Sequence, residues 1–374
     1  MKKEYISLGL MSGTSSDGID ASIIKSNGEI LEKKKIFEIL ENQYFEYDNE
    51  FLDKILNLRE KINNLSDLKK FREEIKTVER ELTIVHAKAV NSMKKKINID
   101  LIGFHGHTIY HNAKEKTSVQ IGDPNLLAQL TKKSVVYNFR TNDLENGGQG
   151  APLAPVFHMA IANQLNFKFS WIILNIGGIS NFTYFDKEKK SFIASDIGPG
   201  NCLIDQWIRK YSNLKLDKDG LIAKSGEIHK QILQDILERD LIKINQKSFD
   251  IKDFDLGFAR GLSLEDGAAT ITEYTVENIC WRLKNEINIH DDNKIKLILS
   301  GGGRKNKFIF EKIKNKLKCE VIAIDEFNID GDFIESQAFA FLSIRSVNGL
   351  PISFNWMTGC EKESCLGGEI INFK

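Results

Sequence analysis

The most constraining feature of the sequence is a pattern that occurs twice: an apolar segment, a turn rich in Gly, Ser, Thr, Asn or Asp, and a second apolar segment. The first copy occupies residues 5–24, with its turn at residues 12–18, and the second occupies residues 171–185, with its turn at residues 177–181. Short apolar runs on both sides of such turns predict β-hairpins. One hairpin therefore opens each half of the chain, which favours two related domains over a tandem array.

Strands and helices alternate between the two hairpins. Residues 101–104 and 134–139 are predicted strands on either side of a helix that begins at Asp123 and Pro124, because Asp caps free amides and Pro suits the first helical position. Apolar residues at three- and four-residue spacing predict one long amphipathic helix over residues 66–93, with Ser66 as its N-cap. Such alternation indicates an α/β architecture.

A third glycine-rich turn follows a predicted strand at residues 295–299. The turn, Ser300–Asn306, leads into a predicted helix whose apolar face is formed by Ile309, Ile313 and Leu317. The 374 residues exceed the usual length of one domain. We expect a first domain at residues 1–167 and a second at residues 168–374.

The composition excludes several classes of protein. Hydrophobic residues make up 41% and charged residues 28% of the chain, which is typical of a folded globular protein. Lys plus Arg and Asp plus Glu both number 52, so no net positive field attracts nucleic acid. No apolar run is long enough to span a bilayer. The five cysteines lack metal or disulfide spacing, which predicts reduced thiols and a cytoplasmic location.

Phosphoryl transfer requires donors around phosphate oxygens, a divalent cation and a carboxylate near the attacking oxygen. The turn Gly13–Gly18 offers backbone amides, three hydroxyls and the Asp17 carboxylate, which are suited to phosphate and hydrated Mg²⁺. The turns Gly177–Asn181 and Gly301–Gly303 offer a second phosphate contact and a surface for an adenine ring. An ordinary hairpin turn is the alternative for each. The Walker pattern GxxxxGK[ST] and an early GxGxxG are absent from the sequence.

Asp196 is the leading candidate for the general base. It follows an apolar strand and precedes a Gly-Pro-Gly turn and a predicted helix, and we expect a position at the helix start to keep it ionised. The alternative role is that of a helix cap.

Polar side chains between the first two hairpins suit a sugar. The amides of Gln120 and Gln149 and the carboxylate of Asp123 lie in loops that could hydrogen-bond hydroxyl groups. Arg140 could pair with a substrate carboxylate or bridge Asp143. Three histidines, His105, His107 and His111, lie close in sequence, but no Cys or Glu accompanies them at a zinc spacing, which disfavours a metal site.

Together these motifs strongly resemble the anhydro-N-acetylmuramic acid kinases, a bacterial family within the actin, sugar-kinase and heat-shock-chaperone ATPase superfamily. The likeness extends from Gly9 to the C-terminus. Its most specific blocks are GLMSGTSSDGID, QIGDPN, GGQGAPLAPVFH, LNIGGISNF, DIGPGNCLIDQW, SGGGRKN and GDFIESQAFAF.

The resemblance implies a duplicated ribonuclease-H-like (actin-like ATPase) fold of two lobes with a cleft between them, the cofactors ATP and Mg²⁺, and a homodimer. The implied reaction uses ATP and water to open the 1,6-anhydro ring of the cell-wall sugar and to phosphorylate its 6-oxygen. Asp196 matches the aspartate that activates water, and Asp17 is the expected metal ligand. The implied nucleotide contacts are Gly13, Thr14, Ser15, Ser16, Asp17, Gly18, Ile19, Asp20, Gly177, Gly178, Ser180, Asn181, Gly301, Gly302 and Gly303. The expected sugar contacts are His105, His107, Gln120, Asp123, Arg140, Asp143, Gln149 and, by resemblance, Glu335.

Three positions and one segment depart from the family pattern. His107 stands for a usual Gln, Asn138 for a usual Asp and Ile197 for a usual Thr, and residues 246–250 lack the usual Thr-Gly-Arg-Glu. These departures leave open a kinase for another sugar or anhydrosugar. A nucleotide-gated binding protein of the actin-like class is a more distant alternative, against which the amide-rich loops at Gln120 and Gln149 speak.

Overall fold

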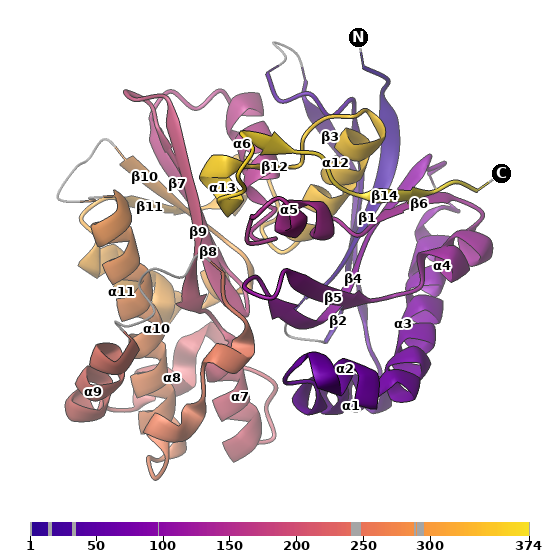
Figure 1. The fold of residues 1–374 in the computed structure, drawn as a ribbon. Helices are drawn as coiled ribbons and strands as arrows, with labels where there is room; N and C mark the ends of the chain where they lie inside the picture. The colour runs from indigo at the N-terminus through magenta and orange to yellow at the C-terminus, as the bar shows by residue number, and fades with distance from the viewer. Residues whose placement is uncertain are drawn as a thin grey trace. The chain divides into compact units, whose positions relative to one another are not determined.

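The computed structural model describes residues 2–13, 17–31, 35–95, 97–240, 248–287, 289 and 295–373. The chain forms two compact units, which are described separately below. Unit 1 comprises residues 1–166 and 333–374, and unit 2 comprises residues 167–332. Each unit is built around its own β-sheet (Figure 1).

Unit 1 contains a sheet with the order β14-β6-β4-β1-β2-β3, to which β5 is added beside β4. Its strands are β1 (Tyr5–Ser12), β2 (Gly18–Ser26), β3 (Phe37–Glu46), β4 (Leu101–Asn112), β5 (Thr117–Ile121), β6 (Ser134–Tyr137) and β14 (Glu369–Ile371), with the small hairpin β12 (Ser353–Phe354) and β13 (Ser364–Cys365). Its helices are α1 (Asn49–Lys61), α2 (Leu65–Lys70), α3 (Arg72–Met93), α4 (Pro124–Thr131), α5 (Thr141–Glu145), α6 (Pro155–Gln164), α12 (Ile334–Val347) and α13 (Asn355–Thr358).

Unit 2 contains a sheet with the order β11-β10-β7-β8-β9. Its strands are β7 (Ser170–Ile176), β8 (Ile179–Asp186), β9 (Ser191–Pro199), β10 (Ile295–Ser300) and β11 (Glu320–Ala323). Its α-helices are α7 (Cys202–Tyr211), α8 (Leu221–Ser225), α9 (Lys230–Asp240), α10 (Leu264–Ile287) and α11 (Lys307–Lys316), and its 3₁₀ turns are η1 (Lys218–Gly220), η3 (Ile251–Asp253), η4 (Leu256–Ala259), η5 (Gly302–Lys305) and η6 (Ile324–Phe327).

The two sheets share one topology. The first three strands of each unit are antiparallel, β1 with β2 and β2 with β3 in unit 1, and β7 with β8 and β8 with β9 in unit 2. Two further parallel strands extend each sheet on the other side of its first strand: β4 pairs with β1 and β6 with β4 in unit 1, and β10 pairs with β7 and β11 with β10 in unit 2. Both predicted hairpins are therefore present. The repeated order 3-2-1-4-5 is that of the ribonuclease-H-like fold, so the predicted duplicated α/β architecture is confirmed.

The C-terminal segment corrects the expected domain range 168–374, because residues 333–374 pack with unit 1. Helix α12 lies directly on the sheet, and a Cβ atom built on Gly9 would come 1.9 Å from the Ser336 carbonyl oxygen. Hydrogen bonds of 2.7 Å between serine hydroxyls fix the helix to β1 and β2: Ser7 with Ser343, and Ser22 with Ser336. Glycine on the strands thus allows a close approach that brings the end of the chain back to its beginning.

The region predicted as one helix behind Ser66 forms two helices. Asn64, not Ser66, caps α2, since its side chain accepts hydrogen bonds from the amides of Ser66 and Asp67. Helix α2 ends before Phe71, and α3 begins directly after it. The apolar stripe of α3 belongs to the core as expected, with Val78 and Leu82 buried.

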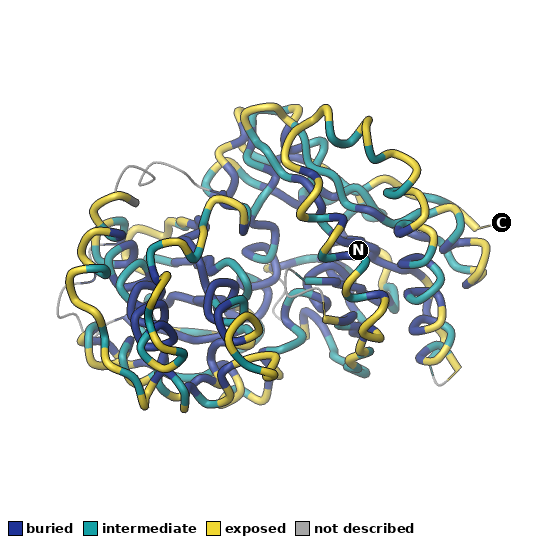
Figure 2. The backbone as a smooth tube through the Cα atoms, turned by 90° about the horizontal axis from the view of Figure 1, so that it is seen from below, coloured by how far each residue is buried: buried dark blue, intermediate teal, exposed yellow. Residues whose placement is uncertain are grey.

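Buried residues are most frequent on the strands β1, β2, β4, β7 and β8 and on the helices α10 and α12. Figure 2 shows the buried segments inside each unit and exposed segments at its periphery. The hydrophobic core of unit 2 includes the predicted apolar face of α11, the helix after the third glycine turn, because Ile309, Ile313 and Leu317 are buried. Within the described ranges, none of the helices combines the length and the apolar composition that a bilayer crossing requires.

Candidate active site

The β7–β8 turn in unit 2 presents backbone amides on one side. The carbonyl oxygen of Gly177 accepts a hydrogen bond from the Asn201 amide at 2.8 Å, and that of Gly178 accepts one from the Gly200 amide, also at 2.8 Å. A trans peptide directs its C=O and N–H to opposite sides. The N–H groups of Gly178 and Ile179 therefore point away from the 200–201 turn, which is an arrangement suited to an anion.

Three polar residues form a row across the same sheet. Asn175 on β7 lies opposite Asn181 on β8, and Asn181 lies opposite Asp196 on β9. Directly opposed residues share one face of a sheet, with Cβ atoms about 5 Å apart. All three are at least nine-tenths buried, and the Oδ1 atom of Asn181 has no hydrogen-bond partner among the described residues. A buried acceptor without a partner is destabilising unless a ligand or water supplies a donor, so the row has the character of a binding site.

Asp196 lies inside β9, and this corrects the expectation that it starts a helix, because α7 begins only at Cys202. Its carboxylate oxygen Oδ2 accepts a hydrogen bond from the Phe249 amide at 3.0 Å. On α10, the buried guanidinium of Arg282 donates to Ser195 Oγ at 3.2 Å and interacts electrostatically with Asp196. Asp196 is thus held by a strand, an amide and a nearby cation, and the helix-cap alternative does not apply.

The three glycines after β10 have different surroundings. Gly301 adopts a positive φ of 74°, and a Cβ atom there would come 2.2 Å from Asn175 Oδ1. A Cβ on Gly303 would come 2.3 Å from the Ile176 side chain. A Cβ on Gly302 would meet nothing closer than Asn201 Nδ2 at 3.9 Å. Gly301 and Gly303 therefore allow the loop to pack on the end of β7, while Gly302 presents bare backbone.

The β1–β2 turn in unit 1 brings carboxylates together, although Thr14, Ser15 and Ser16 lie outside the described residues. The pKa of Tyr44 is raised mainly by burial and further by the negative charges of Asp17 and Asp20. Both carboxylates therefore lie near the same phenol. The Asp17 carbonyl oxygen accepts a hydrogen bond from the Tyr47 amide at 2.9 Å. Gly13, Gly18 and Ile19 flank these groups on the hairpin. Carboxylate oxygens are the donors that Mg²⁺ prefers, so this pair fits the predicted metal.

A buried imidazole and a guanidinium form a second cluster in unit 1. Nδ1 of His105 donates to the Gly106 carbonyl oxygen at 3.0 Å, so Nε2 is the acceptor, and Arg140 Nη2 donates to it at 2.9 Å. Burial and the charge of Arg140 hold the pKa of His105 well below its usual range. Burial likewise raises the pKa of the Glu335 carboxyl, and the Arg140 charge opposes this rise. Neutral His105 therefore positions a cation near a carboxyl group.

His107 belongs to a different hydrogen-bonded chain. Its Nδ1 lies 3.1 Å from Ser12 Oγ, which accepts a hydrogen bond from the Tyr47 hydroxyl at 3.0 Å. Burial lowers the pKa of His107 to about 3. A neutral imidazole thus occupies this position and contacts Ser12, the last residue of β1.

The amide and carboxylate loops differ in their surroundings. Gln120 on β5 is half-buried, and its Nε2 donates to Ser118 Oγ at 2.7 Å. Asp123 caps α4 by accepting hydrogen bonds from the amides of Asn125 and Leu126, and Pro124 begins the helix as predicted. The backbone amide of half-buried Gln149 donates to the Thr358 carbonyl oxygen at 2.9 Å. Contact of these three side chains with a sugar stays a prediction.

Asp143 has the contacts of a positioning residue, and it is 1% exposed. Its carboxylate accepts hydrogen bonds from the hydroxyls of Ser353 and Thr358, both at 2.6 Å, and from the Gly150 amide at 2.7 Å. Arg140, which was considered as a partner for Asp143, instead donates to His105 and to the Gly150 carbonyl oxygen. The Asp143 carboxylate therefore holds the end of the loop at residues 146–150 through its hydrogen bond with the Gly150 amide.

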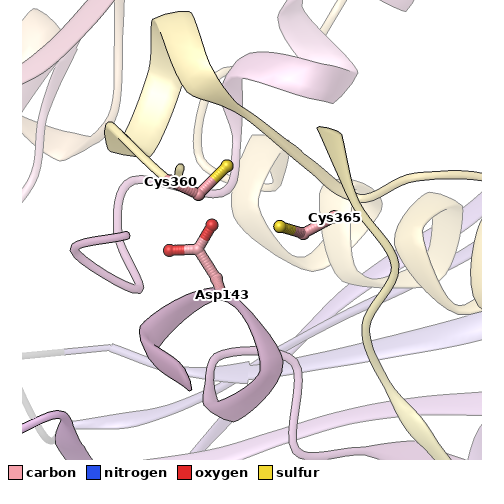
Figure 3. A group of neighbouring side chains, drawn as sticks. All are labelled: Asp143, Cys360 and Cys365. Carbon is pink, nitrogen blue, oxygen red and sulfur yellow. The ribbon is translucent and has the colours of Figure 1, made fainter. Parts of the chain in front are cut away.

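Two thiols complete the surroundings of Asp143 (Figure 3). One potential ligand atom from each of Asp143, Cys360 and Cys365 lies within 4.8 Å of the other two. Burial raises the pKa of the Cys360 thiol to about 12, and Cys360 Sγ donates to the Lys362 carbonyl oxygen at 3.2 Å. The Cys360 thiol and a carboxylate already bound by three neutral donors form a hydrogen-bonded centre between α5 and the C-terminal hairpin. Of the five cysteines, Cys360 and Cys365 therefore lie together beside Asp143, whereas Cys202, Cys280 and Cys319 belong to the core of unit 2.

The departures from the family pattern occupy different environments. Asn138 adopts a positive φ of 53°, its Nδ2 donates to the Glu369 carboxylate, and its Oδ1 accepts from Thr141. Ile197 is buried next to Asp196 in the core of unit 2. Positions 246 and 247 lie outside the described residues.

Sequence reasoning did not assign functions to Asn175 and Arg282. Asn175 was visible as a polar residue near the end of an apolar strand, and its pairing with Asn181 could have been inferred from the hairpin register. Arg282 gave no local signal, because its approach to Ser195 depends on how α10 packs against β9.

Comparison with known proteins places the chain in one family over nearly its whole length. The family model for anhydro-N-acetylmuramic acid kinase matches residues 4–372. A curated anhydro-N-acetylmuramic acid kinase of Pelagibacter ubique (strain HTCC1062) is 46% identical over 99% of both chains. The kinase of the same name from Zymomonas mobilis is 35% identical over 95% of this chain and 96% of its own, and that of Agrobacterium fabrum is 37% identical over 97% and 98%. The chain therefore belongs to the anhydro-N-acetylmuramic acid kinase family.

Proposed function

We propose that this protein is an ATP-dependent kinase that opens the anhydro ring of 1,6-anhydro-N-acetylmuramic acid with water and produces N-acetylmuramic acid 6-phosphate. The observation that carries the proposal is the buried row Asn175–Asn181–Asp196 beside the amides of the β7–β8 turn, in a chain that matches this family over residues 4–372. The family match does not favour the alternative of a nucleotide-gated binding protein.

In the proposed reaction, Asp196 accepts a proton from a water molecule whose oxygen attacks the anomeric carbon. The bond between that carbon and the 6-oxygen breaks, and the freed 6-oxygen attacks the γ-phosphorus of ATP, so that ADP leaves. The proton held by Asp196 passes to solvent at the end of the cycle. Each atom is accounted for by sugar, water and ATP, and the base needs only to orient one water and remove one proton.

The nucleotide side of the proposal rests on backbone groups. The N–H groups of Gly178 and Ile179 are assigned to phosphate oxygens, and the exposed backbone of Gly302 to the adenosine. Asp17 and Asp20 would hold Mg²⁺, directly or through water, since both supply oxygen donors near Tyr44. The bound ion would neutralise charge on the phosphates.

The sugar side rests on side chains of unit 1. We assign Arg140 and Glu335 to direct contact with the sugar, with His105 holding the guanidinium in place through Nε2. Gln120, Asp123, His107 and the Gln149 loop are further proposed contacts, and Asp143 positions that loop. A homodimeric state and a cytoplasmic location remain proposals that rest on family resemblance. Light scattering in solution tests the first of these.

The experiment that tests the function is a reaction in H₂¹⁸O with MgATP and the anhydrosugar, followed by mass spectrometry of the product. The proposal predicts that the sugar gains one phosphate and one ¹⁸O at the anomeric carbon, with no ¹⁸O in the phosphate. Gain of phosphate without water would contradict the coupled mechanism. A panel of other sugars and anhydrosugars under the same conditions serves as the control for substrate choice, which the His107 departure makes necessary.

A further inference from the structure

Arg304 follows the three glycines of the loop after β10, and its guanidinium uses all five N–H donors. Nε and Nη2 form a forked pair with the Asp325 carboxylate at 2.5 and 2.7 Å. Nη2 also reaches Asp330 Oδ1 at 3.3 Å, and Nη1 reaches Asp332 Oδ1 at 2.5 Å. The remaining donation, from Nη1, goes to the Gly301 carbonyl oxygen at 3.0 Å. A guanidinium has five such donors in a fixed plane, so this one is saturated.

The same guanidinium joins the glycine loop to residues 330–332. The Gly301 amide donates to the Gly331 carbonyl oxygen at 3.1 Å, and a Cβ on Gly331 would come 2.5 Å from Arg304 Nε. The loop is therefore fixed on this side by one backbone hydrogen bond and one buried cation. Asp332 is also the last residue of unit 2 before the chain returns to unit 1. Arg304 itself is 7% exposed.

A run of three glycines has more conformational freedom than any other tripeptide, and this freedom is lost when a ligand orders it. A loop that is already fixed before binding avoids that loss and binds more tightly. Gly303 is fixed by its packing on Ile176, but Gly301 depends on the Arg304 and Gly331 contacts, and Gly302 lies between them. The contacts of Gly301 and Gly303 therefore determine whether the backbone of Gly302 already has its ligand-binding conformation before the ligand arrives.

We propose that Arg304 is a positioning residue that holds the Gly301–Gly303 loop in the shape that binds the nucleoside part of ATP. This inference rests on the proposed function, because that function assigns the loop to adenosine. The surrounding charges indicate that Arg304 fixes the conformation of the loop and does not bind phosphate. Three carboxylates surround its guanidinium, and every donor is used within unit 2.

The test compares Arg304→Lys with Asp325→Asn. Lysine keeps the charge but has three donors in place of five and no planar fork, so it cannot reproduce the bonds to Gly301 and all three carboxylates. Asp325→Asn removes a carboxylate and leaves the Arg304–Gly301 bond in place. Lys305→Ala is the matched control, because Lys305 pairs with Asp332 from an exposed position. For each variant, the dissociation constant of a nonhydrolysable ATP analogue with Mg²⁺, the KM of the anhydrosugar and the melting temperature are measured.

We expect Arg304→Lys to weaken nucleotide binding about tenfold or more, as when one charged hydrogen bond is lost, while the sugar KM changes less than about twofold. Asp325→Asn is expected to lower the melting temperature and leave nucleotide affinity within about threefold. Equal nucleotide affinity in wild type and Arg304→Lys would overturn the inference alone, as would a loss that follows the melting temperature equally in both variants. A wild-type protein that does not bind the analogue would overturn the proposed function as well.

Discussion

The two units share a strand order but offer ligands different kinds of groups. In unit 2, the turn at Gly177 and Gly178 and the backbone of Gly302 present main-chain groups, and Asp196 is a single carboxylate within a strand. In unit 1, most of the candidate groups are side chains such as His105 and Arg140, held by hydrogen bonds to their neighbours. Backbone amides suit the repeated oxygens of a phosphate, and varied side chains suit the irregular hydroxyls of a sugar. Duplication of one fold has therefore supplied two scaffolds with different chemistry at their strand ends.

The largest expected difference between the two units is in how much stability each loses in acid. His86, His105, His107 and His158 are buried in unit 1, and burial lowers their pKa, to about 4 for His86 and about 3 for His107 and His158. The unfolded chain binds protons below about pH 6.5, and the folded one does so only near these lower values, so stability falls as the pH drops from about 6.5 towards 4. Each group costs roughly 1 kcal/mol at pH 5.5, so the four together cost several kcal/mol.

This loss should appear in unit 1 first, because His229, the one described histidine of unit 2, is exposed. Urea unfolding at pH 7.5 and 5.5, with proteolysis and mass spectrometry to locate the fragments, measures it. Equal loss in both units, or none, would remove the proposed electrostatic difference between them.

The second prediction concerns the base in unit 2. Asp196→Asn keeps the size and shape of the side chain, and the asparagine carbonyl oxygen can still accept the hydrogen bond from the Phe249 amide. The neutral amide cannot, however, accept a proton from water. We expect kcat to fall by about a hundredfold or more, which is the scale of lost general base catalysis, with nucleotide affinity nearly unchanged. Steady-state kinetics together with direct binding of an ATP analogue checks this, and unimpaired turnover would remove Asp196 from its role.

A third prediction separates packing from binding within one loop. In Gly303→Ala the new Cβ meets Ile176 at 2.3 Å, so we expect a loss of about 1–3 kcal/mol in the stability of unit 2. In Gly302→Ala the nearest atom is 3.9 Å away, so stability should change by less than about 1 kcal/mol while nucleotide affinity falls. Chemical denaturation and analogue binding measure the two effects. A Gly302→Ala protein with normal affinity would show that this face does not contact the nucleotide.

The smallest expected effect is at His107. His107→Gln restores the usual family residue and can keep a hydrogen bond to Ser12. We expect the sugar KM to change by less than about fivefold, with kcat retained, since one hydrogen-bonding group replaces another. Kinetics with the anhydrosugar and with a second sugar tests this. A reversal of preference between the two sugars would show that His107 selects the substrate.

The parts that could be predicted from sequence were those with local signals. Both hairpins, the Asp123 cap and the helix after Ser300 follow from turn residues and apolar spacing within short windows. The return of α12 to unit 1 could not be predicted in this way, because it depends on a match between Gly9 on a strand and a helix more than 300 residues later.

The site shows the same division. The turns at residues 12–18 and 177–181 were predicted, yet the buried contacts of Asp143 were not, since its partners Ser353 and Thr358 approach only when the C-terminal segment folds back. Asp196 was predicted from its motif as the candidate base, and that role stays a prediction, but its place in β9 depends on how far that strand continues. Motifs indicate which groups take part, and long-range packing decides how each one is held.

The division of recognition between the units is tested most directly by hydrogen–deuterium exchange with mass spectrometry, with a nonhydrolysable ATP analogue and the anhydrosugar added separately. We predict that the analogue protects residues 177–181 and 301–303 together with the β1–β2 turn, and that the sugar protects residues 105–123 and 140–150. Protection of residues 177–181 by the sugar alone, or no protection of residues 301–303 by the analogue, would contradict this assignment.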